Sequence, residues 1–418
     1  MRGSGNNWQS RPLGELATTT SGGTPSRKRK DYYGGSIPWV KSGELNDDYI
    51  FETEEHITET GLKNSSAKLF PSGTVLIALY GATVGKTSIL RTDASTNQAV
   101  CGITPGPNID AGYLRYHLIS LRRELLSHRY GGAQPNISQQ IVRNQKISYP
   151  PPPEQKKIAH ILSTVQRAIE AQERIIQTTT ELKKALMHKL FTEGLRNEPQ
   201  KQTEIGLVPE SWEVVELGDL LTIAQYGMSV KGNPEGNYPI LRMTNQVDGQ
   251  IVDRNLQYVE IGDADFAKFK VERGDILFNR TNSLDLVGRT AIFDIAGGFV
   301  FASYLIRLRT DERQLNPFFL NCYFNTDEVQ ARLKSIATRA VSQSNISATR
   351  LKGFPFPKPS LDEQEEIVAH AKALDRKLAV HWGKLEQLQD LFRTLLHELM
   401  TAKIRVHELE LQIPFSSR

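Results

Sequence analysis

The chain lacks the features that mark several classes of protein. Its two cysteines, Cys101 and Cys322, are too few for a disulfide framework or a cysteine-rich zinc site, and we expect both to be buried thiols. No apolar run approaches the roughly 18 residues that a membrane-spanning helix needs, and the first residues hold no apolar stretch typical of a signal peptide. We therefore expect a soluble, cytoplasmic protein.

A large excess of one charge is also missing. The 51 Lys and Arg residues nearly balance the 47 Asp and Glu residues, and the net charge of +4 does not by itself predict nucleic-acid binding. With 39% hydrophobic and 23% charged residues, the composition is that of a globular protein and excludes wholesale disorder. At roughly 150 residues per domain, 418 residues favour two or three domains.

Catalytic and cofactor motifs are absent as well. Gly81–Thr87 is one residue short of a phosphate-binding loop, and its counterpart Val287–Thr290 has no lysine, so we favour a strand-to-strand loop facing nucleic acid or solvent. Asn316–Phe319 differs from the Asn-Pro-Pro-Tyr/Phe loop of adenine methyltransferases, and we expect a helix start with Phe packed inward. His397 lacks the second histidine that a zinc helix needs. We predict no catalytic residues, no metal site and no cofactor.

What the sequence does contain is an internal repeat. Trp8 and Leu13–Leu16 return in the second half as Trp212 and Leu217–Leu220. From Asn136 onward, matched positions lie 209 residues apart over 61 residues without a gap. A spacing held for so long indicates duplication of a two-part unit, and hence a pseudo-twofold repeat.

Each repeat reads as a globular part followed by a long helix. Short apolar runs such as Val75–Leu79 and Asp275–Phe278, broken by Gly, Asn and Pro, are typical of short strands joined by loops. Each globular part ends in a proline-rich stretch, Pro150–Pro153 or Pro355–Pro359, which cannot lie inside a helix. We expect a helix to begin directly after each stretch.

Both helical segments carry apolar residues at alternating spacings of three and four, including Leu182 in the first and Trp382 in the second. Each segment has about 40 residues and would be roughly 60 Å long. The two helices would bury such stripes by packing on each other as an antiparallel coiled coil; alternatively, each helix folds back on its own globular part. Representative positions of the stripes are Ile158, Val165, Ile176, Leu186, Ile367, Leu374, Leu385 and Leu395.

We therefore predict an α+β protein with two globular α/β domains and two long helices. The first domain spans residues 1–153, and the central helix spans 154–196. The second domain spans 197–362, and the distal helix spans 363–407.

Polar and basic residues in the loops of both globular parts suggest DNA binding. Arg and Lys neutralise phosphates, while Arg, Asn and Gln make the paired contacts that distinguish guanine and adenine edges. Such residues are also common on surfaces, but one set in each copy favours the functional interpretation. The candidates are Arg27, Lys28, Lys41, Lys86, Gln134 and Asn136 in the first copy, and Arg242, Asn245, Arg280, Asn282, Arg289, Arg339, Gln343 and Asn345 in the second.

The whole chain resembles the specificity subunit of type I restriction-modification systems. The resemblance is carried by Ile37–Val40, by Pro151–Ile158 at the start of the first helix and by Leu361–Ile367 at the start of the second. A proline-rich entry followed by Glu-Gln and an apolar helix is fairly specific when it occurs twice. Thr179–Leu182 also resembles a short central repeat whose copy number, in some family members, sets the spacing of the recognition site.

The resemblance implies a non-catalytic, DNA-reading subunit. Its two target recognition domains would each read one half of a bipartite, asymmetric site on double-stranded DNA, and the helical spacer would fix the half-site separation. The helices, with the apolar positions given above, would dock two methyltransferase subunits. Motor-nuclease subunits would complete the complex, and catalysis would reside in these partners.

Two other classes of function stay open at this point. The first is an enzyme, a nuclease or methyltransferase with its own recognition domains, which would need the cofactor loop and catalytic residues that we do not find. The second is a coiled-coil scaffold without DNA reading, in which the basic loops only keep the protein soluble.

Overall fold

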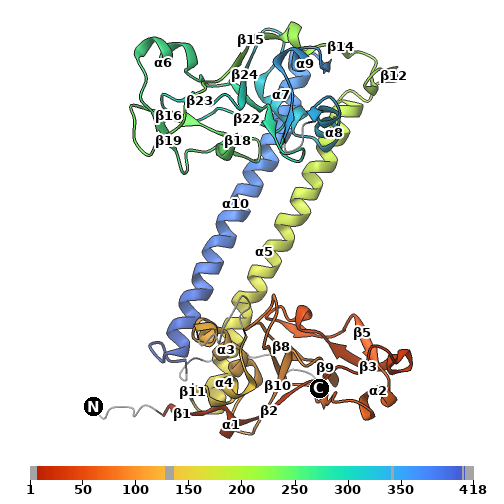
Figure 1. The fold of residues 1–418 in the computed structure, drawn as a ribbon, viewed down its shortest axis with the longest axis vertical. Coiled ribbons are helices and arrows are strands. Elements are labelled where there is room, and N and C mark those ends of the chain that lie inside the picture. The colour runs from red at the N-terminus through yellow and green to blue at the C-terminus, as the bar shows by residue number, and fades with distance from the viewer. Residues whose placement is uncertain (1–6, 128–135, 340–342, 407–408, 410–418) are drawn as a thin grey trace. The chain divides into compact units, whose positions relative to one another are not determined.

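The computed structural model describes residues 7–127, 136–339, 343–406 and 409 (Figure 1). The chain divides into two compact units, the first made of Met1–Glu173 with Gly383–Arg418 and the second of Arg174–Trp382. Each unit contains one globular domain and part of each of two long helices, α5 (Pro152–Glu193) and α10 (Leu361–Met400). None of the helices in the described ranges is long and apolar enough to cross a membrane.

The first domain is built on two β-sheets. Its five-stranded sheet has the order β2-β10-β7-β8-β4, its four-stranded sheet has the order β5-β3-β9-β6, and β1 pairs with β11. The strands are β1 (Gln9–Pro12), β2 (Ala17–Ser21), β3 (Tyr33–Val40), β4 (Tyr49–Ile50), β5 (Glu55–Ile57), β6 (Leu69–Phe70), β7 (Val75–Ala78), β8 (Thr87–Leu90), β9 (Ala94–Thr96), β10 (Val100–Pro105) and β11 (Lys146–Tyr149). The helices are α1 (Leu13–Leu16), α2 (Glu59–Lys63), α3 (Ala111–Ser127) and α4 (Gln139–Asn144).

The second domain has a six-stranded sheet of order β15-β24-β20-β22-β18-β17. Two three-stranded sheets, β19-β16-β23 and β21-β26-β25, and the pairs β14-β27 and β12-β13 complete it. The strands are β12 (Gln200–Thr203), β13 (Gly206–Pro209), β14 (Glu213–Glu216), β15 (Leu221–Tyr226), β16 (Tyr238–Leu241), β17 (Gln246–Val247), β18 (Gln250–Ile251), β19 (Gln257–Val259), β20 (Ile276–Asn279), β21 (Thr281–Asn282), β22 (Thr290–Ile292), β23 (Val300–Phe301), β24 (Leu305–Thr310), β25 (Thr338–Arg339), β26 (Ser344–Asn345) and β27 (Pro355–Lys358). The helices are α6 (Asp263–Phe269), α7 (Pro317–Phe324), α8 (Asp327–Ser335) and α9 (Ala348–Lys352).

The strand order confirms the internal repeat. The run β2-β10-β7-β8-β4 corresponds to β15-β24-β20-β22-β18. In both runs the last two strands are parallel, while the other neighbours are antiparallel. The second domain adds β17 and the sheet β21-β26-β25, where the described part of the first domain has only an isolated bridge between Tyr80 and Asn136.

The short apolar runs seen in the sequence form the central strands β7 and β20. All four residues of each strand are buried, which explains why these runs do not alternate between apolar and polar residues. Gly73 and Gly274 turn the chain into these strands with φ angles of +87° and +90°. Glycine adopts this left-handed conformation without a steric penalty, so the repeated glycine has a backbone cause.

The helix starts differ in part from the prediction. Helix α5 already begins at Pro152, inside the proline-rich stretch, and Pro153 also lies in its first turn. The first-turn N–H groups of a helix have no partner within the helix, so proline is tolerated there and its fixed φ suits the helix. Helix α10 begins at Leu361, two residues after Pro359.

The repeated Glu-Gln motif anchors each helix to its own domain. The Gln155 side chain is fully buried, and its Oε1 accepts the Asp110 N–H at 2.8 Å. Its counterpart Gln364 accepts the Asn316 N–H at 2.8 Å. In both copies the amide Nε2 donates to the carbonyl oxygen of the proline five positions earlier. The motif therefore has a structural role at the junction of domain and helix.

In the first unit the beginning of α5 packs beside the end of α10. Ile158 and Leu162 share one hydrophobic core with Leu399. The Glu154 carboxylate, only 3% exposed, accepts hydrogen bonds from Nε and NH2 of Arg405 at 2.8 and 2.9 Å. This contact ties the chain that follows α10 to the first turn of α5.

In the second unit the end of α5 packs beside the beginning of α10. Leu190 and Ile367 share the core of this unit, and Lys183 forms an ion pair with Asp375. Oε1 of Glu363, near the start of α10, accepts the backbone N–H of the second residue after α5 at 2.8 Å. Within each unit, therefore, the parts of the two helices run in opposite directions.

The structure also locates two features weighed in the sequence. Helix α7 begins directly after Asn316, whose Oδ1 caps the Phe318 N–H at 2.9 Å, and Phe319 is fully buried, as expected for a helix start. Cys101 is buried, and Cys322 is partly exposed as a residue, although its thiol is desolvated. Burial raises the pKa of Cys101 to about 12 and the pKa of Cys322 to about 11.

Helix α3 carries a buried histidine in the core of the first domain. The His117 side chain lies against the Tyr113 ring, with the ring centroids 5.9 Å apart. Its Nε2 accepts the Ser148 N–H at 3.2 Å, which places the proton of the neutral ring on Nδ1. Burial lowers the pKa of His117 to about 4.

We expect the first unit to lose stability below pH 6.5. The unfolded chain protonates His117 near pH 6.5, whereas the folded chain keeps it neutral down to about pH 4. The stabilisation is therefore complete above pH 6.5, and it decreases by roughly 3 kcal/mol as the pH falls through about 4. Urea unfolding of wild type and His117→Gln between pH 7 and 4 tests this, because glutamine can accept the same N–H without titrating. Equal pH dependence of the two proteins would contradict it.

Candidate nucleic-acid interface

Three separate segments of the first domain meet at the end of strand β7. The Thr83 hydroxyl, in the β7–β8 loop, donates to the Ser42 carbonyl oxygen at 2.6 Å. Tyr80, in the same loop, forms the isolated bridge with Asn136. These contacts place the candidates Lys41, Lys86 and Asn136 on neighbouring segments. We call residues 41–44, 80–86 and 136 the first polar face.

The second domain brings equivalent segments together at the end of β20. The Asn282 amide Nδ2 contacts the Met243 sulfur at 3.0 Å, and the Asn345 amide donates to the Thr281 hydroxyl at 2.7 Å. The strands β21, β26 and β25 join Thr281–Asn282, Ser344–Asn345 and Thr338–Arg339 in one small sheet. We call residues 242–245, 280–289, 338–339 and 343–345 the second polar face.

Glycine shapes the same tight turn in both faces. Gly85 and Gly288 have φ angles of +78° and +89°. Their N–H groups donate back across the hairpin to Ala78 and Asn279, at 2.8 and 2.9 Å. The segment Gly81–Thr87 thus connects strands β7 and β8, as favoured over a nucleotide-binding loop.

The residues that follow these glycines occupy equivalent positions. The Lys86 carbonyl oxygen accepts the Ala78 N–H, and the Arg289 carbonyl oxygen accepts the Asn279 N–H. Lys86 is half-buried and Arg289 is exposed. One cation therefore stands at the same point of each hairpin.

The candidate Asn245 is a structural residue, which corrects the sequence prediction. Its side chain is fully buried and caps a short 3₁₀ turn, with Oδ1 accepting the Arg242 N–H at 3.0 Å. Its amide donates to Val252 and Arg254 carbonyl oxygens at 3.2 and 3.0 Å. Because every polar atom of the side chain is used inside the domain, it cannot contact DNA. Glu44 caps the equivalent turn in the first domain by accepting the Lys41 N–H at 2.8 Å.

Two cations of the first domain are already paired with carboxylates. Arg27 contacts Glu55 at 2.6 Å, and Lys41 contacts Glu54 at 2.6 Å and Glu55 at 3.2 Å. The hydrogen bond from Arg27 lowers the pKa of the Glu55 carboxyl group. Exposed ion pairs contribute little free energy, so DNA phosphates could displace these carboxylates, but both cations start out neutralised. Lys28, next along the chain, is exposed.

The remaining candidates differ in how far the structure describes them. Gln134 lies outside the described residues, and Arg339 belongs to β25, but its side chain is not described. Gln343 is exposed and directly precedes β26, while Asn282 is half-buried. Arg242 is half-buried, and its NH2 donates to the carbonyl oxygen of Asn255 at 2.8 Å.

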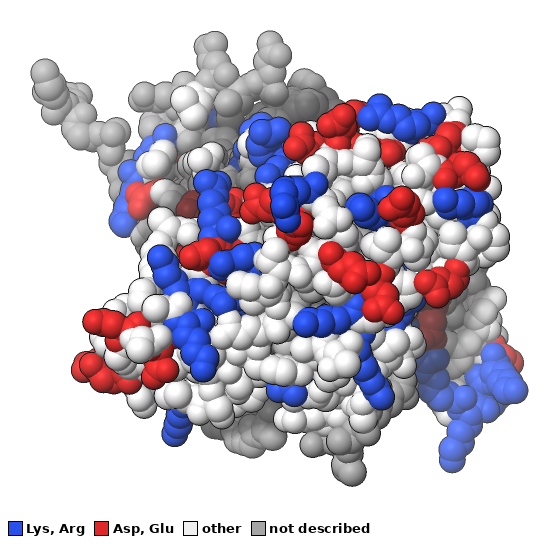
Figure 2. Space-filling view, turned by 90° about the horizontal axis from the view of Figure 1, so that it is seen from above, with Lys and Arg blue, Asp and Glu red and all other residues white. Residues whose placement is uncertain are grey.

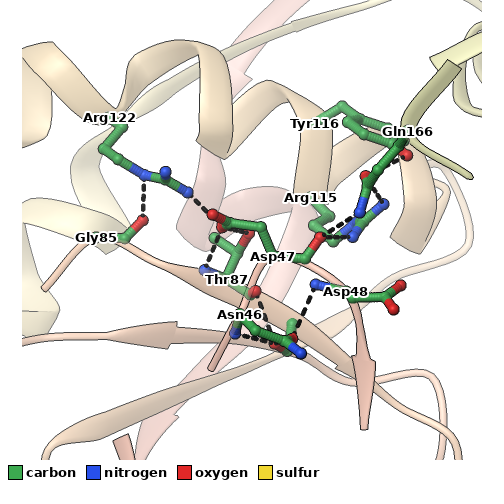
Figure 3. A network of polar contacts seen from close by, with 10 residues as sticks. Asn46, Asp47, Asp48, Gly85, Thr87, Arg115, Tyr116, Arg122 and Gln166 are labelled. Carbon is green, nitrogen blue, oxygen red and sulfur yellow. Dashed lines mark hydrogen bonds and ion pairs between the residues drawn. The ribbon is translucent and has the colours of Figure 1, made fainter. Parts of the chain in front are cut away.

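A half-buried network of polar contacts supports the first domain behind its polar face (Figure 3). The Asp47 carboxylate accepts the Thr87 N–H at 2.9 Å and forms an ion pair with Arg122. The Arg122 Nε donates to the carbonyl oxygen of Gly85 at 2.8 Å. Arg122 of α3 thus holds the loop before β4 and the β7–β8 hairpin together.

The same network reaches helix α5. The carbonyl oxygen of Asp47 accepts hydrogen bonds from Arg115 and from the Gln166 amide, the latter at 2.9 Å (Figure 3). Gln166 Oε1 in turn accepts from Arg115 at 3.2 Å and from the Tyr116 hydroxyl at 3.0 Å. Since Gln166 belongs to α5, the network fixes the domain on its helix.

No sequence motif pointed to this network, although the repeat holds a signal for it. Asp47 and Asp248 occupy matching positions, 201 residues apart, and both have positive φ angles, +68° and +47°. Aspartate is one of the few non-glycine residues enriched in this conformation. The partners of Asp47 could not be foreseen, because Arg115 lies 68 residues further along the chain and Gln166 lies 119 residues further.

Charge on the face drawn in Figure 2 is mixed rather than uniform. Figure 2 views the molecule from the end at which Figure 1 draws β14 and α9, and on this side Lys and Arg side chains are interspersed with Asp and Glu side chains. A surface of this kind does not present the continuous basic footprint that binds the phosphate backbone without sequence preference.

The apolar stripes of the helices are only partly buried. Ile158, Ile176, Ile367 and Leu385 are buried, and Val165, Leu186, Leu374 and Leu395 are half-buried. The four buried side chains pack within the chain, and the four half-buried ones keep part of their surface exposed; docking of a partner by these positions stays a prediction. In contrast, Leu182 and Trp382, predicted to lie in the stripes, are each 56% exposed.

No group of three or more His, Cys, Asp or Glu side chains suited to a metal ion occurs within the described residues.

Comparisons with known proteins identify the family. A model of the type I restriction modification DNA specificity domain matches residues 5–180 and 209–390. The MjaIX specificity subunit of Methanocaldococcus jannaschii, a type I restriction enzyme subunit, is 25% identical over 96% of this chain and 94% of its own length. The protein designated MjaX of the same organism is 33% identical, but the alignment spans 51% of each chain.

A solved structure shares the fold. The crystal structure of the type I restriction-modification S subunit from M. genitalium has a TM-score of 0.59 and 17% identity, and the match covers 96% of this chain and 98% of that one.

Two copies of a DNA specificity domain on one chain define a DNA-specificity protein. The chain belongs to the type I restriction-modification specificity family. It is a specificity subunit and not one of the catalytic subunits of such a system. The family predicted from the proline-rich entries and the Glu-Gln motifs is thereby confirmed.

Proposed function

We propose that this chain reads the two halves of a bipartite, asymmetric site on double-stranded DNA, one half with each domain. The observation that carries the proposal is the pair of polar faces. Both faces are built on the same turns of the same repeated sheet, at the ends of β7 and β20. A duplicated scaffold with a polar face in each copy suits a protein that reads two separate half-sites.

Different side chains on the two faces support an asymmetric target. Lys41 and Lys86 of the first face correspond to Arg242 and Arg289 of the second. Lysine acts as a point charge, whereas arginine offers a planar fork of donors suited to guanine. The second face also adds the small sheet that carries Asn345. Two faces with different donors read different sequences.

Helix α5 would set the distance between the half-sites. It runs without a break from Pro152 to Glu193, with its first part in one unit and its last part in the other. A helix of constant length makes half-site separation a geometric constant, on the order of one turn of DNA, about 34 Å. The coiled-coil pairing of α5 with α10 over their full lengths is part of this proposal.

The function can be tested by expressing this chain with its methyltransferase subunits in a strain without DNA methylation. Single-molecule sequencing of methylated bases should reveal one bipartite, asymmetric motif, and the motif should be absent when this chain is omitted. A motif that is independent of this chain, or no methylation although another specificity subunit activates the same methyltransferase, would contradict the proposal. A palindromic motif would contradict the asymmetry.

We further propose that exposed apolar side chains of the helices dock two methyltransferase subunits, with motor-nuclease subunits joining to complete the complex. Within the second unit, Ile175 is 41% exposed, and Leu182, Val380 and Trp382 are each 56% exposed. Large apolar side chains on helices are costly to leave in water, and tryptophan is enriched among residues that dominate interfaces. The partner would cover these side chains.

Replacing both Leu182 and Trp382 with alanine should weaken methyltransferase docking roughly 30-fold or more, because truncating a central tryptophan commonly costs 2 kcal/mol or more. Co-purification and sedimentation with the methyltransferase measure the loss. Leu207→Ala is the matched control, since Leu207 is 52% exposed and belongs to the β12–β13 hairpin rather than to either helix. Normal docking by the double variant would refute this surface.

A further inference from the structure

Arg280, in the second polar face, forms a small cluster with the Tyr226 ring and, through its backbone, with Tyr304. Tyr226 is 41% exposed and Tyr304 is 49% exposed. The Arg280 guanidinium carbon stands 4.7 Å from the centroid of the Tyr226 ring. An arginine placed over a partly exposed aromatic ring is typical of a binding surface for a flat or charged group.

The backbone holds Arg280 firmly in place. Its N–H donates to the Tyr304 carbonyl oxygen at 3.0 Å, and its carbonyl oxygen accepts the Ile346 N–H at 2.9 Å. The residue therefore sits at a fixed point between β20 and β21. The Tyr226 hydroxyl accepts the Ala348 N–H at 2.9 Å, so the ring beneath the guanidinium is fixed as well.

The Arg280 side chain has spare hydrogen-bonding capacity. One terminal nitrogen donates to the Ser303 carbonyl oxygen at a long 3.3 Å, and Nε is buried without an acceptor among the described residues. No carboxylate pairs with Arg280 in the described part of the chain, in contrast to Arg309, which contacts Asp275 at 2.7 Å. The buried Nε cannot reach a ligand, so the capacity left for one is on the terminal nitrogens, and no carboxylate among the described residues neutralises the guanidinium.

The first domain has no such cluster at the equivalent positions. The same backbone hydrogen bond there joins the Leu79 N–H to the Ala99 carbonyl oxygen at 2.7 Å, and both side chains are buried. Ser21 ends β2 where Tyr226 ends β15, and its hydroxyl donates to Gln139. The first domain forms the same sheet without this cluster. Its presence in the second domain therefore indicates a function specific to that domain.

We infer that Arg280 reads a guanine in the half-site of the second domain, with Tyr226 as its positioning residue. This inference rests on the proposed function. Guanine presents two parallel acceptors, O6 and N7, which match the fork of an arginine, and such a pair discriminates by about 1–3 kcal/mol. A phosphate would be served by any nearby cation, whereas the planar fork of a guanidinium placed over a ring suits two parallel acceptors.

The test uses the full chain in complex with its methyltransferase subunits and a randomised double-stranded DNA library. Wild type should select a guanine at one position of one half-site. Both Arg280→Ala and Arg280→Lys should lose that preference by roughly 10- to 100-fold, because lysine keeps the charge but not the fork. The other half-site is the internal control and should be selected unchanged, which also shows that the variants fold.

Variants of the ring test the positioning role. Tyr226→Ala should reduce the same guanine preference, whereas Tyr226→Phe keeps the stacked ring and should largely retain it. A purely structural role of Tyr226 would instead lower selection of all sequences equally.

Several outcomes would overturn the inference without touching the proposed function. Uniform loss of affinity in Arg280→Ala, near-normal binding by Arg280→Lys and a salt dependence reduced by about one unit would identify a phosphate contact. A half-site without guanine, or variants that select like wild type, would also refute guanine reading. If wild type selected no bipartite sequence at all, the proposed function itself would fail.

Discussion

Inserting four residues into α5 beside Thr179–Leu182 is expected to lengthen the gap between the two half-sites by one to two base pairs and to abolish recognition of the original target. Four helical residues add about 6 Å, and one base-pair step of DNA is about 3.4 Å. Both half-sites should stay unchanged, because neither polar face is altered. Sequencing of the methylated motif made by the variant complex measures the gap directly.

An insertion of four residues is chosen because it preserves the packing of α5 around this segment. Thr179 is only 6% exposed, and the Thr180 hydroxyl donates to the Ile176 carbonyl oxygen at 2.8 Å, so the segment is a regular part of the helix. Four residues are close to one full turn of 3.6, which keeps the buried side of the helix in line. Two residues would turn the following side chains by about 200° and should prevent proper packing.

A control insertion separates spacing from general damage. Four residues after Glu204, in the exposed turn between β12 and β13, lengthen the chain outside α5 and outside both polar faces. This variant should methylate the original motif. A changed half-site with an unchanged gap in the α5 variant would contradict the spacer role.

Replacing Arg405 with alanine is expected to destabilise the first unit by about 2–4 kcal/mol. The Glu154 carboxylate is 3% exposed and receives both guanidinium hydrogen bonds from Arg405, at 2.8 and 2.9 Å. Removing one partner of a buried pair leaves a desolvated charge, which usually costs several kcal/mol. The partial exposure of Arg405, 27% of its side chain, lets water offset part of the loss.

The repeat supplies a matched control for this effect. Arg196 lies 209 residues before Arg405 and pairs with Glu366 at 2.7 Å, but both side chains are about half exposed. Arg196→Ala should therefore leave the stability almost unchanged. Urea unfolding followed by hydrogen exchange in α3 and the first turns of α5 compares the two variants. Equal effects would show that burial of Glu154 is not the cause.

Much of the architecture could be predicted, because repeats, helical periodicity and turn residues are visible in short stretches of the sequence. The repeat is visible in Trp8 and Trp212, and the helices are visible in their apolar spacing. Pro152 shows the limit of such rules, since a proline that ends a strand-rich domain can also open a helix. The family followed from the same local motifs and is confirmed by the comparisons.

The polar faces could be predicted only in part. Gly85 and Gly288 mark the hairpins, because a positive φ angle favours a particular residue. The roles of Asn245 and Arg27 could not be predicted. The polar atoms of the Asn245 side chain are all hydrogen-bonded within the domain, and Arg27 is paired with a glutamate 28 positions away. Nothing in the sequence singled out Tyr226, because its proposed positioning role depends on a contact with Arg280.

The sequence by itself determined that this protein is a duplicated, two-domain specificity subunit with two long helices, because periodicity, turn residues and repeated motifs act over short stretches of chain. Only the tertiary structure decided which polar residues remain available to a ligand. Asn245 and Arg280 both lie in polar segments of the sequence, yet the Asn245 side chain is buried with every polar atom bonded, while the Arg280 guanidinium lies over a partly exposed ring with one long hydrogen bond. Burial and pairing are set by residues far apart along the chain, so local sequence cannot encode them.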